Sequence, residues 1–224
     1  MFYGALEFSR DTDIAILAEA WNLQRLSWAL DKLQAKCIAV PHFSIRYLKR
    51  GHAIHFRCYH PEVRGIRIDV MSAMRGVDSF AELWQRRTTV ETEPGQKYDL
   101  ISLPDLVLAK KTQRDKDWPM IRRLVEAHYI QYRKKPIPEQ INFWLKESRT
   151  VSILVRFAKK YPARLSALVK QRPLLALAGA GDEEGLEKAL REEEMREREA
   201  DRNYWQPLIA ELEKLRHRKF KRNS

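Results

Sequence analysis

The sequence contains few cysteines. Only Cys37 and Cys58 occur among its 224 residues, and each lies in an apolar run of strand-like character. Small core residues are therefore expected at these positions rather than a disulfide framework. This scarcity excludes the small secreted domains that disulfides stabilise, and it favours a reducing, cytoplasmic compartment.

Long apolar runs are missing as well. No stretch is long enough to span a bilayer, so a membrane protein is not expected. The first residues show no basic segment leading into an apolar stretch and no small-residue cleavage site, so we expect no secretory leader. No internal repeat is present.

Acidic residues are outnumbered by basic ones. The chain has 42 Lys and Arg against 30 Asp and Glu, which gives a formal net charge of +12. Such a molecule attracts polyanions and nucleotide phosphates, although charge alone does not identify the partner. Charged residues make up 32% and hydrophobic residues 44%, as is usual for a globular protein with a modest core.

The first half of the chain alternates strand and helix patterns. Residues 11–18 alternate in character, which predicts a half-buried strand, and Asn22 then caps a predicted helix whose leucine stripe would pack on the sheet. Strands at 53–59 and 65–71 are expected to form a hairpin. Other elements predicted here are a short apolar run at 37–40, a helix at 79–87, a strand at 88–92, and helices at 102–111 and 116–133.

The second half shows only helical patterns. Beyond Pro136 these segments are broken at Pro162, at Pro173 and around residues 179–181, and the end of the chain, residues 216–222, is strongly basic. An α+β fold is therefore expected, with one domain over residues 1–134 and an all-helical region with a basic tail over residues 135–224.

Three aspartates stand out as candidate metal ligands. Asp11 and Asp13 lie two residues apart on a predicted strand, so both carboxylates project to one side. On the second strand of the hairpin, Asp69 and Arg67 are forced onto the face opposite the apolar residues. If that strand neighbours the first, the three carboxylates converge as two-metal nucleotidyl transfer requires. By spacing alone, a turn or a solvated strand edge is the simpler explanation for Asp11 and Asp13, because a bare Asp-x-Asp is common.

The residues around these aspartates resemble a known family. The stretch Ser9-Arg-Asp-Thr-Asp-Ile-Ala-Ile resembles the DNA polymerase β-like nucleotidyltransferase superfamily, in which Ser or Thr, an Asp-x-Asp pair and an apolar strand recur. Residues 65–71 resemble its third-carboxylate strand. Residues 98–117 resemble the helix after the sheet in abortive-infection (AbiE-type) and minimal nucleotidyltransferases. The resemblance implies a nucleotidyltransferase fold, a mixed sheet flanked by helices.

The resemblance also implies roles for individual residues. Asp11 and Asp13 would bind Mg²⁺ or Mn²⁺, and Asp69 would be a further ligand or the base that activates the attacking hydroxyl. The substrate would be a nucleoside triphosphate. The residues that it would contact are Ser9, Arg10, Lys110 and Arg114.

Lys110, Arg114 and Asp117 follow one another at helical spacing. Steps of four and three residues would place them on one helical face, where the two cations could hold a triphosphate. An ordinary solvated face with an Arg114–Asp117 ion pair is the other interpretation. By spacing alone it is the simpler one, and with the family resemblance both remain open.

One part of the family pattern is not found. The family has a Gly-Ser or Gly-Gly turn before the Asp pair, whose backbone grips the nucleotide phosphates. Gly4 is the one glycine before Asp11, and no pair of small residues accompanies it. We therefore expect either impaired nucleotide binding or a start of the chain further upstream.

Two other groups of residues suggest a function but also have simpler explanations. His52, His55 and His60 flank the hairpin with Cys58, but Cys58 faces away from His55 in an alternating strand, so surface imidazoles are expected rather than a zinc site. Basic clusters interleaved with aromatic residues could follow an RNA backbone, or the aromatics could be core residues beside solvated cations. The clusters are residues 122–123, 133–135, 159–160 and 216–222, and the aromatics are Tyr129, Tyr132, Trp144 and Tyr161.

Two functions from different classes follow. The first is an enzyme that transfers a nucleotide to a hydroxyl of RNA or protein, which the resemblance associates with the toxin of a type IV toxin–antitoxin pair, held in check by an antitoxin. The second is a catalytically silent relative that keeps the fold as a binding module for a partner protein or nucleic acid.

Overall fold

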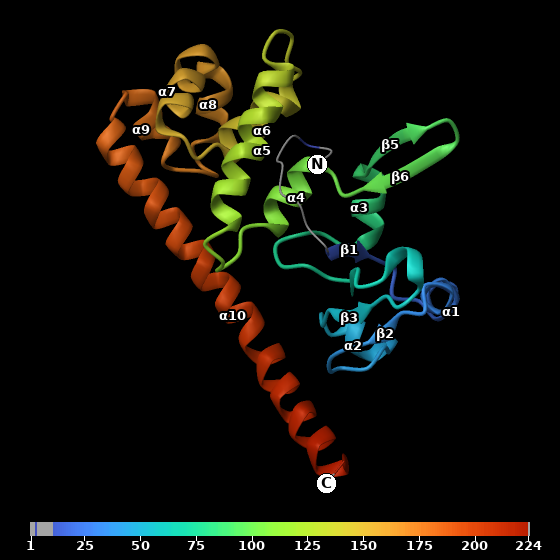
Figure 1. Ribbon diagram of the computed structural model, residues 1–224. Helices are drawn as coiled ribbons and strands as arrows, with labels where there is room; N and C mark the ends of the chain where they lie inside the picture. The colour runs from blue at the N-terminus through green and yellow to red at the C-terminus, as the bar shows by residue number, and fades with distance from the viewer. Residues whose placement is uncertain (1–2, 4–10, 224) are drawn as a thin grey trace. The chain divides into compact units, whose positions relative to one another are not determined.

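The computed structural model describes Tyr3 and residues 11–223 (Figure 1). The described residues form two compact units. The sheet unit takes its residues from Phe8–Asp105 and Asn203–Ser224, and the helical unit takes its own from Met1–Glu7 and Leu106–Arg202. This division falls earlier in the chain than the expected boundary after residue 134. The described chain is α+β, with a four-stranded mixed sheet, a two-stranded sheet and ten α-helices.

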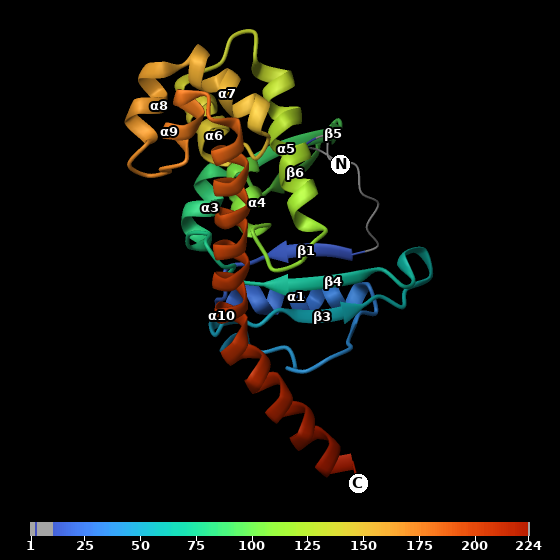
Figure 2. The ribbon, with the colours of Figure 1, turned by 90° about the vertical axis from the view of Figure 1, so that its left-hand side faces the viewer.

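The four-stranded sheet consists of β1 (Asp11–Ala15), β2 (Lys36–Cys37), β3 (Ile54–Arg57) and β4 (Arg67–Met71). Their order is β1-β4-β3-β2, as Figure 2 shows for β1, β4 and β3. Strand β1 runs parallel to β4, whereas β3 pairs antiparallel with both β4 and β2. The predicted hairpin is thus β3–β4, and its strands are joined through a 3-10 helix at Pro61–Val63.

Helix α1 (Ala20–Lys32) covers the apolar face of this sheet. The predicted leucine stripe packs there: Leu30 is buried, and Leu23, Leu26 and Leu33 lie against the same core. Glu19, not the predicted Asn22, is the N-cap residue. Asn22 is already inside the helix, and its Nδ2 donates to the carbonyl of Leu17 at 2.9 Å.

The cysteines differ in burial. Cys58 belongs to the core of the sheet unit, and burial raises the pKa of its thiol. Cys37 is exposed, so its expected place in the core is wrong. The reason is that β2 is an edge strand of only two residues, both exposed, so neither of its faces is covered.

Short elements complete the sheet unit: α2 (Ile45–Lys49), α3 (Phe80–Arg86), β5 (Thr88–Glu93) and β6 (Gln96–Leu100). Strands β5 and β6 form the separate two-stranded sheet. Helix α3 begins with a capping box in which Ser79 N–H donates to the Glu82 carboxylate at 3.0 Å. Helix α4 (Leu103–Ala109) is capped by Ser102, as predicted, because Ser102 Oγ accepts from the Asp105 N–H at 3.3 Å.

The helical unit has an aromatic core. Its helices are α5 (Asp117–Tyr132), α6 (Pro138–Glu147), α7 (Val151–Lys160), α8 (Pro162–Leu168) and α9 (Leu175–Ala180), with the first part of α10 (Glu183–Asn223). Trp144 is fully buried, and its ring centroid lies 5.2 Å from that of Tyr129 and 5.7 Å from that of Phe157. RNA stacking is therefore wrong for Tyr129 and Trp144, and the core interpretation of these two residues is confirmed.

Helix α10 continues to Asn223, so residues 216–222 belong to a helix that also contains Pro207. In the sheet unit, Tyr204 and Leu208 of this helix lie against Gly51, which has a positive φ of 92°. None of the helices formed by the described residues has both the length and the apolar character needed to cross a bilayer.

Candidate active site

Five polar side chains share the face of the four-stranded sheet opposite α1. In the parallel β1–β4 pair, Asp13 lies beside Asp69 and Asp11 lies beside Arg67. In the antiparallel β3–β4 pair, His55 lies on the other side of Asp69. Because side chains alternate along a strand, these residues face away from the core that Ile14, Ile68 and Val70 help to form. This polar face is therefore built from the middle of three adjacent strands.

Asp69 is the centre of a hydrogen-bonded group. Arg67 donates to it twice, from Nε to Oδ1 at 2.7 Å and from Nη2 to Oδ2 at 2.5 Å. His55 Nδ1 lies 2.8 Å from the same Oδ1. Both carboxylate oxygens of Asp69 are thus engaged, and a bidentate pair of this kind also fixes the orientation of Arg67.

Burial and charge act in opposite directions on this group. Asp69 is 8% exposed, and burial by itself would raise the pKa of its carboxyl. Hydrogen bonds from Arg67 and His55, and their charges, outweigh burial, so the pKa of Asp69 lies below its ordinary value. The pKa of Arg67 is raised, first by its hydrogen bond to Asp69 and also by the charges of Asp11 and Asp13. Asp11 and Asp13 are therefore close enough to act on the guanidinium.

The donor chemistry of this face fits a hard divalent cation. Asp11 and Asp13 have exposed side chains on the same face as Asp69, and carboxylate oxygens are the ligands that Mg²⁺ and Mn²⁺ prefer. Within the part of the chain that the structure describes, no three His, Cys, Asp or Glu side chains are already gathered as a metal site. A cation shared with Asp69 would compete with Arg67 for its oxygens.

Arg67 and His55 were not assigned a role from the sequence. Both could have been found from alternation, because Arg67 lies two residues before Asp69 on one strand and His55 lies on the partner strand of the hairpin. Alternation does not determine the register of the two strands, however, and it is the register that places His55 opposite Asp69 rather than one residue away.

The other predicted nucleotide contacts do not share one helix. Lys110 follows the end of α4 and Arg114 precedes the start of α5, so the expected common helical face of Lys110, Arg114 and Asp117 is wrong. The chain turns here because the buried Asp117 accepts hydrogen bonds from the Thr112 hydroxyl and from Arg114 Nε, the latter at 2.8 Å. The Arg114–Asp117 ion pair of the simpler interpretation is present.

Lys110 and Arg114 belong to the helical unit, whereas Asp11, Asp13 and Asp69 belong to the sheet unit. Ser9 and Arg10, the remaining predicted nucleotide contacts, lie outside the described residues, as does Gly4.

The histidines around the hairpin are not all surface imidazoles. His52 is only 1% exposed, and its Nε2 lies 2.8 Å from Oε2 of Glu211 on α10. Arg50 Nη1 approaches the other oxygen of Glu211 at 2.6 Å. The pKa of Glu211 is lowered mainly by the hydrogen bond with His52. The surface expectation is thus wrong for His52, because a helix from the other end of the chain covers it.

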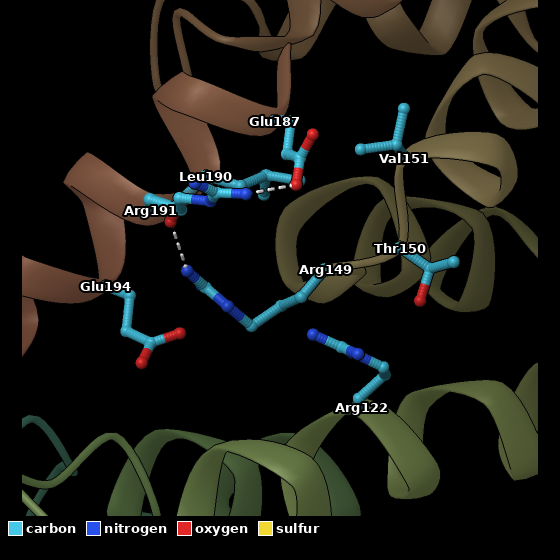
Figure 3. A pocket seen from close by; sticks show the side chains of 8 residues that line it. All are labelled: Arg122, Arg149, Thr150, Val151, Glu187, Leu190, Arg191 and Glu194. Carbon is cyan, nitrogen blue, oxygen red and sulfur yellow. Dashed lines mark hydrogen bonds and ion pairs between the residues drawn. The ribbon is translucent and has the colours of Figure 1, made fainter. Parts of the chain in front are cut away.

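A hollow of about 250 Å³ lies within the helical unit (Figure 3). Arg149 is buried there, which lowers the pKa of its guanidinium, and it donates to Glu193 at 2.9 Å and to the Leu190 carbonyl at 2.8 Å. Arg172 shares Glu193 at 2.7 Å. Most of the buried charge is thus balanced internally. The hollow is lined by Arg122, Arg149, Thr150, Val151, Glu187, Leu190, Arg191 and Glu194.

The chemistry of the sheet face is the more distinctive of the two sites. It combines exposed carboxylates on β1 with an ionised, oriented carboxylate on β4, as cation binding beside a reacting phosphate requires. No protein-family model matches the sequence, and no curated protein matches it.

Proposed function

We propose that the sheet unit is a nucleotidyltransferase domain that moves a nucleoside monophosphate from a nucleoside triphosphate to a hydroxyl of RNA or protein. The observation that carries this proposal is the parallel register of β1 and β4, in which Asp13 lies beside Asp69 with Asp11 on the same face. Three carboxylates on one sheet face are what two-metal phosphoryl or nucleotidyl transfer needs.

Each residue of the face has a role in this proposal. Asp11 and Asp13 would hold Mg²⁺ or Mn²⁺, and Asp69 would act as a further ligand or as the base toward the acceptor hydroxyl. Arg67 and His55 keep Asp69 ionised and oriented through the hydrogen bonds described above. When bound, the metal ion neutralises charge on the phosphate and on the leaving pyrophosphate.

Two parts of the proposal rest on the sequence resemblance alone. One is contact of the triphosphate with Ser9, Arg10, Lys110 and Arg114. The other is the cellular role, a toxin that an antitoxin partner holds in check.

Transfer of label tests the enzyme directly. The full chain is incubated with Mg²⁺, total RNA and each nucleoside triphosphate labelled at the α-phosphate. Label is expected on RNA or on protein with the unaltered chain, and it should be lost with Asp11→Asn and with Asp13→Asn, because each removes a metal ligand. Glu62→Gln is the matched control, since Glu62 is an exposed carboxylate of the same unit away from the polar face. Equal labelling by all four folded chains would overturn the proposal.

One observation favours a catalytically silent binding module instead. Both oxygens of Asp69 already accept hydrogen bonds from Arg67, so the carboxylate is engaged before any cation is added. A silent module would show no transfer, and Mg²⁺ with a triphosphate would not raise its melting temperature. A ligand-dependent rise that disappears in Asp13→Asn would exclude this second function, because only the native state can bind through that face.

A further inference from the structure

Helix α1 carries large aromatic residues on the face turned away from its core contacts. Trp21, Arg25, Trp28 and Lys32 follow one another at steps of four, three and four residues, which places them along a single line on the helix. Leu30 points the other way, into the core. Trp21 is 55% exposed and Trp28 is 63% exposed. The leucine stripe therefore accounts for the stability of α1 but not for these two indoles.

Each of these indoles has a cation beside it. The guanidinium carbon of Arg25 lies 5.9 Å from the ring centroid of Trp21, and Lys32 Nζ lies 3.6 Å from that of Trp28. We call these residues the Trp–cation stripe; its members are Trp21, Arg25, Trp28 and Lys32.

The stripe is positively charged and open to water. Among the described residues, Arg25 and Lys32 form no ion pair with a carboxylate, and both are exposed. Asp31 is an exposed acid next to the line, and Glu19 at the start of α1 is paired with Lys49 at 3.4 Å. Two largely exposed indoles on one helix face are costly to leave in water and mark interaction surfaces. Because the two indoles alternate with unpaired cations, the stripe indicates an anionic partner that also has flat apolar surfaces.

We propose that the Trp–cation stripe binds single-stranded nucleic acid. Unpaired bases would stack on Trp21 and Trp28, while Arg25 and Lys32 would contact phosphates. Every base has a face that can stack on an aromatic ring, and this contact needs a strand whose bases are not already paired. Two tryptophans seven residues apart on a helix are separated by roughly 10 Å along its axis, a distance that a few nucleotides of an extended strand can span. The net charge of +12 supports the same class of partner.

This surface is separate from the candidate active site. The stripe lies on the outer side of α1, and α1 covers the sheet face opposite Asp11, Asp13 and Asp69. The inference therefore does not depend on the proposed function.

Binding of short labelled oligonucleotides to the full chain, followed by fluorescence anisotropy in EDTA, tests the stripe. Oligouridylate, oligothymidylate and a duplex of mixed sequence are compared. Both single strands are expected to bind more tightly than the duplex, and a preference between them identifies RNA or DNA as the partner. Trp21→Ala and Trp28→Ala should each weaken single-strand binding about tenfold or more. Arg25→Gln with Lys32→Gln should reduce the salt dependence, by about 0.7 in the logarithmic slope for each lost phosphate contact.

Trp84→Ala is the matched control, because Trp84 on α3 is also exposed, at 46%, and has the guanidinium of Arg87 4.1 Å from its ring centroid. It should leave binding unchanged. The proposal is overturned by equal losses for Trp84→Ala and Trp28→Ala, by duplex binding as tight as single-strand binding, or by no binding at all. Sedimentation of the same chains tests whether the stripe is a protein interface instead. A dimer that Trp28→Ala dissociates, with unchanged oligonucleotide binding, would make the stripe a protein interface and also overturn the proposal.

Discussion

At the scale of single residues, the charge of Asp69 depends on Arg67. We expect Arg67→Met to lower the free energy of unfolding by about 1–3 kcal/mol, because it leaves a buried carboxylate without its bidentate donor. Urea unfolding measures this change. Arg57→Met is the control, since Arg57 lies opposite Arg67 in the register but is exposed, and its effect should stay within about 0.5 kcal/mol.

A double variant distinguishes the ion pair of Arg67 with Asp69 from the packing of the Arg67 side chain. Arg67→Met with Asp69→Asn should recover part of the lost stability, because the buried charge is removed together with its partner. If the double variant instead loses as much stability as the two single variants together, Arg67 stabilises the sheet by packing and not by pairing with Asp69.

The burial of His52 could not be predicted from the sequence. Nothing near His52 in the chain marks it as buried, and its partner Glu211 lies 159 residues away. Cys58 is the opposite case, because it directly follows β3 and the alternation continued from that strand is enough to turn it toward the core.

At the scale of elements, the two faces of α1 are expected to respond differently to truncation. Leu30→Ala should lower the free energy of unfolding by roughly 2–5 kcal/mol, because it leaves a cavity in the core of the sheet unit. Trp28→Ala, on the exposed face, should change it by less than about 0.5 kcal/mol. Thermal or urea unfolding of both variants measures the difference. A large loss for Trp28→Ala would mean that this indole has a structural role and that its exposure needs another explanation.

Elements in which apolar residues recur with a clear period were predicted well. The β3–β4 hairpin, α1, α3 and α5 all occur close to their expected positions. Helix α2, which has five residues, and β6, which has a largely exposed polar sequence, were not predicted because neither shows an amphipathic pattern. The break between α4 and α5 agrees with the separate helices predicted at 102–111 and 116–133, but the common helical face assumed for Lys110, Arg114 and Asp117 ran across it.

At the scale of the whole molecule, the stability of the helical unit is expected to depend on pH through Glu193. Burial alone would raise the pKa of Glu193, but the hydrogen bond and charge of Arg172, with the charges of Arg149 and Lys111, bring its pKa below the ordinary value. A carboxyl with a lowered folded pKa contributes stability above its unfolded pKa of about 4.3, and that contribution is lost as the pH falls through the folded value.

Urea unfolding monitored by circular dichroism between neutral and acidic pH measures this contribution. Stability should decline as the pH falls below about 4.3, and Glu193→Gln should flatten that part of the profile and lower the stability at neutral pH. Glu199→Gln serves as control, because Glu199 is an exposed residue of the same helix. Identical profiles for the unaltered chain and Glu193→Gln would contradict the assigned charge balance.

The sequence by itself determined which side chains share a strand face, because alternation is a local property of the extended backbone. It therefore placed Asp11 with Asp13, and Asp69 with Arg67. Only the tertiary structure decided that β1 lies parallel to β4 with Asp13 beside Asp69, and that α10 covers His52. Strand neighbours, register and helix docking depend on the burial of apolar surface between segments far apart in the chain, which no local pattern contains.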